Sequence, residues 1–206
     1  YQGVEQVQKN GSAAVVTIKV FDKELDKHFL VELAMQQLAD GTWQISKIDN
    51  LKTLISERDQ ALQNKLAELN APVQKQIDDA VAVSPQKIFI TSAPYSGVIR
   101  LLEADIQLTN NAMKELQYFT GFLELYNADN ELFYSGNFAS SKDLAAKQTA
   151  VYKFNWELNP FLTDDAKVMN SDFSKVTWKA SLSSLSFADG STIELLTQLP
   201  VKAATK

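Results

Sequence analysis

The sequence predicts an α+β fold that is mainly β: an antiparallel three-stranded meander, a linking helix and a C-terminal antiparallel β-sandwich. Two changes in hydrophobic periodicity support this prediction. Apolar residues alternate with polar ones before residue 50, recur every three or four residues to about residue 83, and alternate again from residue 87. Alternation is typical of half-buried strands, and the longer spacing of an amphipathic helix. Turn signals between the later strands favour a sandwich over a parallel sheet.

The predicted boundaries follow these changes of period. We expect the meander at 1–50, a helical connector at 51–84, the sandwich at 85–200 and a disordered tail at 201–206. Two strands of the meander place apolar side chains on one face, namely Ala14, Val16, Ile18 and Val20, then Phe29, Val31, Leu33 and Met35. Asp40-Gly41 predicts a hairpin into a third strand with Trp43 and Ile45, because this dipeptide suits the turn that matches strand twist.

The helical segment carries one apolar stripe, formed by Leu51, Leu54, Ile55, Leu62, Leu66, Leu69, Val73 and Ile77. Pro72 interrupts it. Proline cannot donate a backbone hydrogen bond and disfavours helical geometry at the preceding residue. We therefore expect either a kinked helix or two helices, over 51–70 and 72–82.

The sandwich segment contains several clear strands. Leu102, Ala104, Ile106 and Leu108 alternate toward a core, as do Tyr152, Phe154, Trp156 and Leu158. The inward phase slips by one residue at Ser183–Ser184, which predicts a β-bulge. We expect a helical turn within 140–148 and a loop at 163–172.

Composition excludes several classes of function. The net charge is −5 and the pI is about 5.0, which argues against a nucleic-acid partner, since such binding depends on Lys and Arg. There is no cysteine, so disulfides, thiolate nucleophiles and Cys-based zinc sites are excluded. The sequence contains no run of 18 apolar residues, so no membrane span is predicted. The chain opens at Tyr1 rather than Met, which leaves open that a signal segment or N-terminal lipid anchor has been removed.

No residue set predicts catalysis, a cofactor or a metal site. His28 is the only histidine, so it cannot supply a histidine-rich metal site, and an exposed strand-end position is favoured. The pairs Asp78–Asp79 and Asp164–Asp165 are adjacent in the chain, and neighbouring side chains of an extended segment point apart. No glycine-rich phosphate loop is present.

The stretch "TGFLELYNADNELFYSG" carries the candidate binding site. Asn127, Asp129 and Glu131 have the spacing of the first calcium-loop ligands, but Leu132 and Phe138 replace the glycine and glutamate that such a loop needs. Asn and Asp suit tight turns, so a hairpin is predicted instead. Loop tips often carry function, which makes the tip the predicted binding site. Its residues are Asn127, Asp129, Asn130 and Glu131.

Two segments resemble known families. "DGTWQISKIDNL", through Asp40, Gly41, Trp43, Ile45, Ile48, Asn50 and Leu51, resembles the closing strands of nuclear-transport-factor-like α+β rolls in bacterial exported domains. Residues 123–127 and 178–191 resemble the Ig-like sandwich modules of bacterial envelope proteins, including those with an F-x-L-Y-D signature. The resemblance implies a partial roll followed by an Ig-like module in a periplasmic, secreted or membrane-anchored protein of a Gram-negative bacterium.

The expected function is non-enzymatic. We expect a binding or spacer module that meets a protein or glycan partner of the cell envelope through sandwich loops and edges. One alternative is a binder of small apolar ligands, with a roll-type cavity built from Val16, Ile18, Val31, Leu33 and Trp43. A carboxylate-based hydrolase is a further alternative. The helix stripe also leaves open a homo-oligomer.

Overall fold

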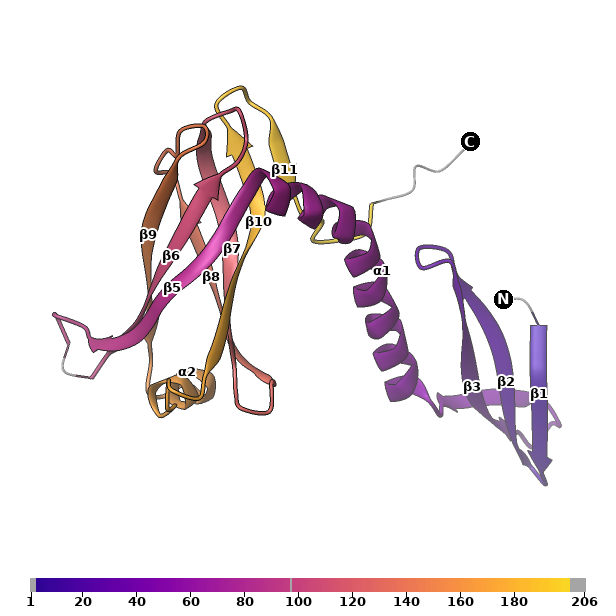
Figure 1. Cartoon of the computed structure of the whole chain (residues 1–206). Coiled ribbons are helices and arrows are strands. Elements are labelled where there is room, and N and C mark those ends of the chain that lie inside the picture. Colours follow the sequence, from indigo (N-terminus) through magenta and orange to yellow (C-terminus); the bar gives the residue numbers. More distant parts are fainter. Residues whose placement is uncertain (1–2, 97, 201–206) are drawn as a thin grey trace. The chain divides into compact units, whose positions relative to one another are not determined.

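The computed structural model describes residues 3–96 and 98–200. The chain is mainly β, with antiparallel sheets and two helices (Figure 1). It divides into two compact units. The first unit runs to Asn70 and includes the segment that starts at Leu196, and the second is Ala71–Leu195. The predicted tail at 201–206 lies outside the described residues.

The first unit contains a four-stranded antiparallel sheet, so the prediction of three strands is wrong. Its strands are β1 (Gly3–Asn10), β2 (Ala13–Asp22), β3 (Lys27–Gln37) and β4 (Trp43–Ile48), in that spatial order. Strand β1 was missed because its two valines, Val4 and Val7, are three residues apart. A register shift between Val4 and Gln6 inserts one extra residue, which brings both valines to the same face.

Helix α1 (Leu51–Ala80) is continuous through Pro72, so of the two predicted alternatives the split into two helices is wrong. Contacts on both sides of the proline hold the helix. Before it, the Asn70 side chain exchanges two hydrogen bonds with the backbone of Leu196. After it, Val73 and the fully buried Ile77 join the core of the second unit. The helix ends at Ala80 and a strand begins at Val81, earlier than the predicted boundary.

The second unit contains two antiparallel sheets and a short helix. One sheet has the order β5-β6-β9, formed by β5 (Val81–Ser92), β6 (Arg100–Asn110) and β9 (Thr149–Leu158). The other has the order β11-β10-β7-β8, formed by β7 (Leu116–Tyr126), β8 (Leu132–Ser140), β10 (Thr177–Phe187) and β11 (Thr192–Glu194). Helix α2 (Thr163–Met169) lies where a loop was predicted. A helix this short offers too few apolar repeats for its period to be recognised.

The two sheets share one apolar core. Leu102, Ala104, Ile106 and Leu108 of β6 are fully buried, as predicted, together with Leu123 and Leu125 of β7. Phe119 of β7 meets Tyr152 of β9 edge to face, with ring centroids 5.0 Å apart and an interplanar angle of 89°. Alternation along each strand therefore supplies one face of a common core.

Two local predictions have different outcomes. The bulge at Ser183–Ser184 is confirmed, because the β10–β7 register shifts between Leu182 and Ser184. The hydroxyl of Thr120 lies 2.8 Å from the hydroxyls of both Ser183 and Ser184. The helical turn expected within 140–148 is wrong, since Leu144 there forms an isolated bridge with Leu116.

Among the described residues, one polar side chain is buried in this core, that of Asn110. Its amide nitrogen donates to the backbone oxygens of Lys114, at 2.8 Å, and Leu144, at 2.9 Å. Its side-chain oxygen accepts the N–H of Ala112 at 3.0 Å. One side chain thus satisfies several backbone groups of two connections.

Neither helix of the described chain combines the length and the apolar composition that crossing a membrane requires.

Candidate functional site

Three connections gather at one end of the second unit, which we call the loop end. They are the β5–β6 connection, the β7–β8 hairpin tip and the segment 159–176, which carries α2 (Figure 1). The pairing of Arg100 with both Ser92 and Leu158 aligns the ends of β5, β6 and β9. Segment 159–176 then runs from β9 in one sheet to β10 in the other, so the loop end spans both sheets.

The hairpin tip forms as predicted. The side-chain oxygen of Asn127 accepts the N–H groups of Asp129, at 3.0 Å, and Glu131, at 2.8 Å. Its amide nitrogen donates to the carboxylate of Glu131 at 3.0 Å. Asn130 has φ of 60°, a left-handed conformation that asparagine tolerates. Three of the four predicted site residues, Asn127, Asn130 and Glu131, therefore build the turn, and Asp129 is exposed on it.

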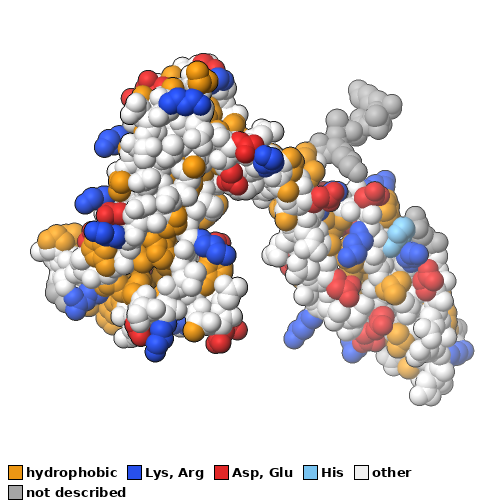
Figure 2. Space-filling model, viewed as in Figure 1, with side chains coloured by type: hydrophobic (Ala, Val, Ile, Leu, Met, Phe, Trp, Pro, Cys, Tyr) orange, Lys and Arg blue, Asp and Glu red, His pale blue; other side chains and the backbone are white. Residues whose placement is uncertain are grey.

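Large apolar side chains stand in solvent on the other two connections. Phe161 is 86% exposed and Leu162 is 57% exposed, while Tyr95 and Val98 are 65% and 59% exposed. The Tyr95 hydroxyl donates to the carboxylate of Glu157 near the end of β9, which ties the β5–β6 connection to that strand. We call these four residues the apolar cluster. Figure 2 shows hydrophobic side chains gathered over this part of the unit.

Hydrogen bonds fix the turn that presents Phe161. The side-chain oxygen of Asn159 accepts the N–H of Phe161 at 3.0 Å, and its backbone oxygen accepts that of Leu162 at 3.0 Å. The carboxylate of Asp165 in α2 accepts the N–H of Asn159 at 2.8 Å. The exposure of Phe161 is therefore built into a bonded turn.

Two hollows flank helix α2. One of about 580 Å³ is bordered by Ile90, Arg100, Pro160, Met169, Asn170 and Phe173. The other, of about 420 Å³, is bordered by Asn127, Phe133, Lys167, Asp172, Lys175 and Val176. Ser171 borders both. Each volume falls in the range of pockets that accept a side chain or small group. The predicted hairpin tip thus contributes Asn127 to one wall of a hollow.

The charged groups of this end are largely paired. Lys167 lies 2.9 Å from Asp164, and Lys175 lies 3.5 Å from Asp172. Hydrogen bonds from the Ser174 hydroxyl and N–H hold the pKa of Asp172 below its usual value. Burial, with the nearby charge of Asp165, raises the pKa of Tyr134 to about 12, so its hydroxyl stays protonated at neutral pH.

The other titratable candidates lie apart from one another. His28 is exposed on β3, with its ring centroid 4.9 Å from that of Phe21. Asp79 pairs with Lys75 at 2.7 Å, whereas Asp78 accepts a hydrogen bond from Gln74. Asp164 and Asp165 likewise contact different partners. Within the described residues, no group of three His, Asp or Glu side chains is arranged to hold a metal ion.

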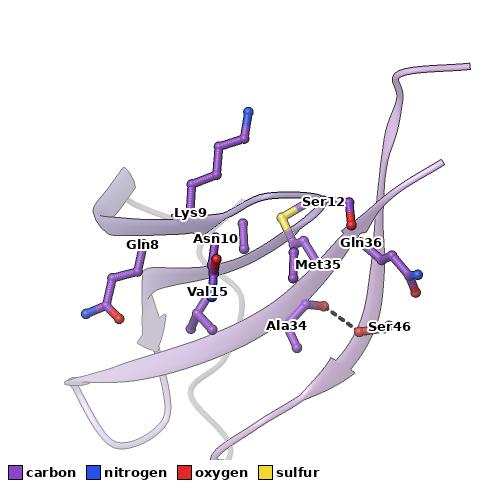
Figure 3. Close-up of a pocket in the computed structure, with 11 residues that line it drawn as sticks. Gln8, Lys9, Asn10, Ser12, Val15, Ala34, Met35, Gln36 and Ser46 are labelled. Atoms are coloured by element: carbon purple, nitrogen blue, oxygen red, sulfur yellow. Dashed lines mark hydrogen bonds between the residues drawn. The ribbon is translucent and has the colours of Figure 1, made fainter. Parts of the chain in front are cut away.

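The first unit contains a hollow of about 460 Å³ near the β1–β2 turn (Figure 3). Polar side chains form much of its border, among them Gln8, Lys9, Asn10, Ser12, Gln36 and Ser46. The Ser46 hydroxyl donates to the Ala34 backbone oxygen at 3.0 Å there. None of the five residues expected to line a roll-type cavity borders this hollow.

The sequence pattern of acids and amides pointed to the hairpin tip and not to the apolar cluster. A usable signal was present in the sequence. Tyr95 follows Pro94, and Phe161 follows Pro160, so each aromatic residue comes directly after a proline in a connection. Proline disfavours strand pairing at such a position, which favours an aromatic side chain outside the sheet.

Comparisons with known proteins give no family. No protein-family model matches the chain, and no curated protein matches it in sequence. Two solved structures are similar over 56% of this chain. The structural-genomics target SoR45 is 12% identical, with 80% of that chain covered and a TM-score of 0.35. The ApaA protein from Bordetella pertussis is 11% identical, with 88% covered and a TM-score of 0.30. Neither likeness carries an argument about function.

Proposed function

We propose that this chain is a non-enzymatic binding protein of the bacterial envelope and that its second unit, an Ig-like sandwich, holds a protein partner at the loop end. The observation that carries the proposal is the turn at Phe161 and Leu162. This turn keeps two large apolar side chains in contact with water, which is energetically unfavourable. Exposed apolar groups that lie together typically mark an interaction site.

The chemistry of the apolar cluster favours a protein over a glycan. Aliphatic and aromatic side chains are exposed on two connections of this end, and the lysines of segment 159–176 are paired with aspartates. Protein interfaces have such an apolar centre with a polar rim. A hollow beside α2 offers a place for an anchoring side chain of the partner.

The Ig-like assignment and the compartment have different support. Two antiparallel sheets with one shared core are the architecture expected of an Ig-like module. The envelope location depends on the sequence resemblance alone. Fractionation of the source bacterium with an antibody against this chain tests it, and recovery of the protein in the cytoplasmic fraction would contradict it.

Site-specific photocrosslinking tests the loop end directly. A photoreactive phenylalanine analogue replaces Phe161 in the chain expressed in its own host. The matched control carries the analogue at Met113, which is 81% exposed in the β6–β7 connection at the opposite end of β6. We expect a discrete protein adduct at position 161 and none at position 113.

The protein found in the adduct is then purified and its affinity measured. Phe161→Asp should weaken binding at least tenfold, because it places a charge in the interface centre, whereas Met113→Asp should leave the affinity unchanged. Equal adducts at both positions, or equal affinities of the two variants, would refute the proposed site.

A further inference from the structure

The first sheet carries apolar rows that cross it from edge to edge. One row joins Val7, Val16, Leu33 and Ile48 through direct cross-strand pairs. The row on one side joins Val4, Ile18 and Val31, and the row on the other joins Lys9, Ala14, Met35 and Ile45. Because paired residues project to the same side, all three rows lie on one face. We call it the open face.

The middle of this face is largely buried, with Ala14 and Val31 each 8% exposed. The Asn50 side chain bonds the backbone of β3 at Leu30 and Glu32, next to the buried Phe29 and Val31. At the two outer strands the rows are uncovered, with Val7 59% exposed and Val4 53% exposed on β1. On β4, Ile45 is 52% exposed and Ile48 is 38% exposed.

The opposite face of the same sheet is more polar, although Leu30, 52% exposed, lies on it opposite Lys19. One of its rows joins Gln6, Thr17 and Glu32, and Lys47 ends the next. Glu5 lies 4.0 Å from Lys19 on this side. Figure 2 shows acidic and basic side chains on the face of the first unit turned to the viewer. The contrast indicates that one face meets water and the other meets a protein surface.

We propose that the open face is a homodimer interface, in which two copies of the first sheet pack face to face about a two-fold axis parallel to the strands. A copy of the sheet has the matching twist for aligned packing. The axis places β1 of one copy over β4 of the other. The small side chains Val4 and Val7 then meet the larger Ile48, so the two edges complement each other.

The charge pattern suits a second copy. Lys9 is the charged residue of the three rows, and its ammonium group lies 5.1 Å from the centroid of the Trp43 ring on the same face. This cation–π contact, together with its long apolar stem, lets Lys9 border an apolar interface. Two open faces therefore meet without opposing unpaired charges at their centre.

The area of the face sets the strength of the dimer. Four strands about 4.8 Å apart, over about six residues of about 3.4 Å each, give about 400 Å² per copy. Two copies then bury at most about 800 Å², which is below the area of a standard specific interface and fits a weak dimer. The dimer should therefore dissociate on dilution.

Sedimentation velocity of the whole chain tests the dimer. We expect a shift from monomer to dimer between about 1 μM and about 100 μM, a range typical of small interfaces. Val7→Lys should raise the dissociation constant at least tenfold. Gln6→Lys, which adds the same charge to the polar face of the same strand, should leave it unchanged. A monomer at every concentration, or equal effects of both variants, would overturn the proposal.

Engineered cysteines test the axis, since the chain has none of its own. Val7→Cys and Ile48→Cys chains are mixed and oxidised. We expect disulfide-linked dimers in the mixture and not in either variant alone, because the axis places each position over the other. Dimers of Val7→Cys alone would contradict this axis. The proposal concerns the first unit and is independent of the function proposed for the second.

Discussion

The two units are built from the same kind of antiparallel strand, yet only the second one buries the apolar face that its strands create. In β6 every second side chain is fully buried, because a second sheet lies across the core. In β1, Val7 has an equivalent inward phase and remains 59% exposed. An alternating strand defines an apolar face, but a second layer is needed to cover it.

The largest effect should come from removing an aromatic group from the shared core. Phe119→Ala should lower the free energy of unfolding of the second unit by about 3–5 kcal/mol, since Phe119 is fully buried among aromatic rings. Phe122→Ala, on the 39% exposed side of the same strand, is the control and should cost less than about 1 kcal/mol. Urea unfolding followed by tryptophan fluorescence measures both. Equal losses of unfolding free energy in the two variants would show that Phe119 is no better packed than the exposed residues of the first sheet.

Asn110→Asp should cause the next largest loss of unfolding free energy. The carboxylate removes the donors that bond two carbonyl oxygens and adds a buried charge, which should cost about 3 kcal/mol at neutral pH. Burial raises the pKa of such an aspartate above its unfolded value. The loss should therefore shrink as the pH falls and the group becomes protonated. Asn111→Asp, at an exposed neighbour, is the control for this unfolding series.

Gly136→Ala should have an intermediate effect. A β-carbon at position 136 would lie 2.7 Å from the indole nitrogen of Trp156, which now donates to the Asn137 backbone oxygen at 2.7 Å. The displaced ring should cost about 1–3 kcal/mol. Combining Gly136→Ala with Trp156→Phe should recover part of the loss, measured as a double-mutant cycle. Strict additivity would exclude the predicted contact.

The smallest effect should appear in acid. Asp189 lies 2.6 Å from Lys114, and this ion pair, with hydrogen bonds from Ser191, holds the pKa of Asp189 well below its usual value of 3.8. Because its pKa is lowered in the folded state, Asp189 stabilises the fold above pH 3.8. This stabilisation is lost as the pH falls further. Asp189→Asn should flatten this part of the curve of melting temperature against pH. Lys114→Met should flatten it similarly, and an unchanged slope in both would contradict the pairing.

The sequence predicted the strands that bury one face in the core of the second unit. Leu102 to Leu108 alternate without interruption, and the phase slip at Ser183–Ser184 was itself visible. Strand β1 was missed because its bulge breaks the alternation that reveals a strand. The continuity of α1 depends on contacts made by Asn70 and Ile77 with distant residues, which no local rule at Pro72 includes.

The candidate site was recognised only in part. The hairpin tip followed from its Asn and Asp residues, since these determine a turn locally. The apolar cluster comes from two connections, and the hydrogen bond that holds Tyr95 joins it to Glu157 of β9, 62 residues away in the chain. The proximity of such segments is a property of the folded sheets.

The bond between Asn70 and Leu196 has a consequence for synthesis. These residues are 126 positions apart, and both belong to the first unit. At about 5–20 residues per second, a ribosome needs roughly 6–25 s to make the intervening chain. The first unit therefore makes this contact only after the whole of the second unit has been synthesised.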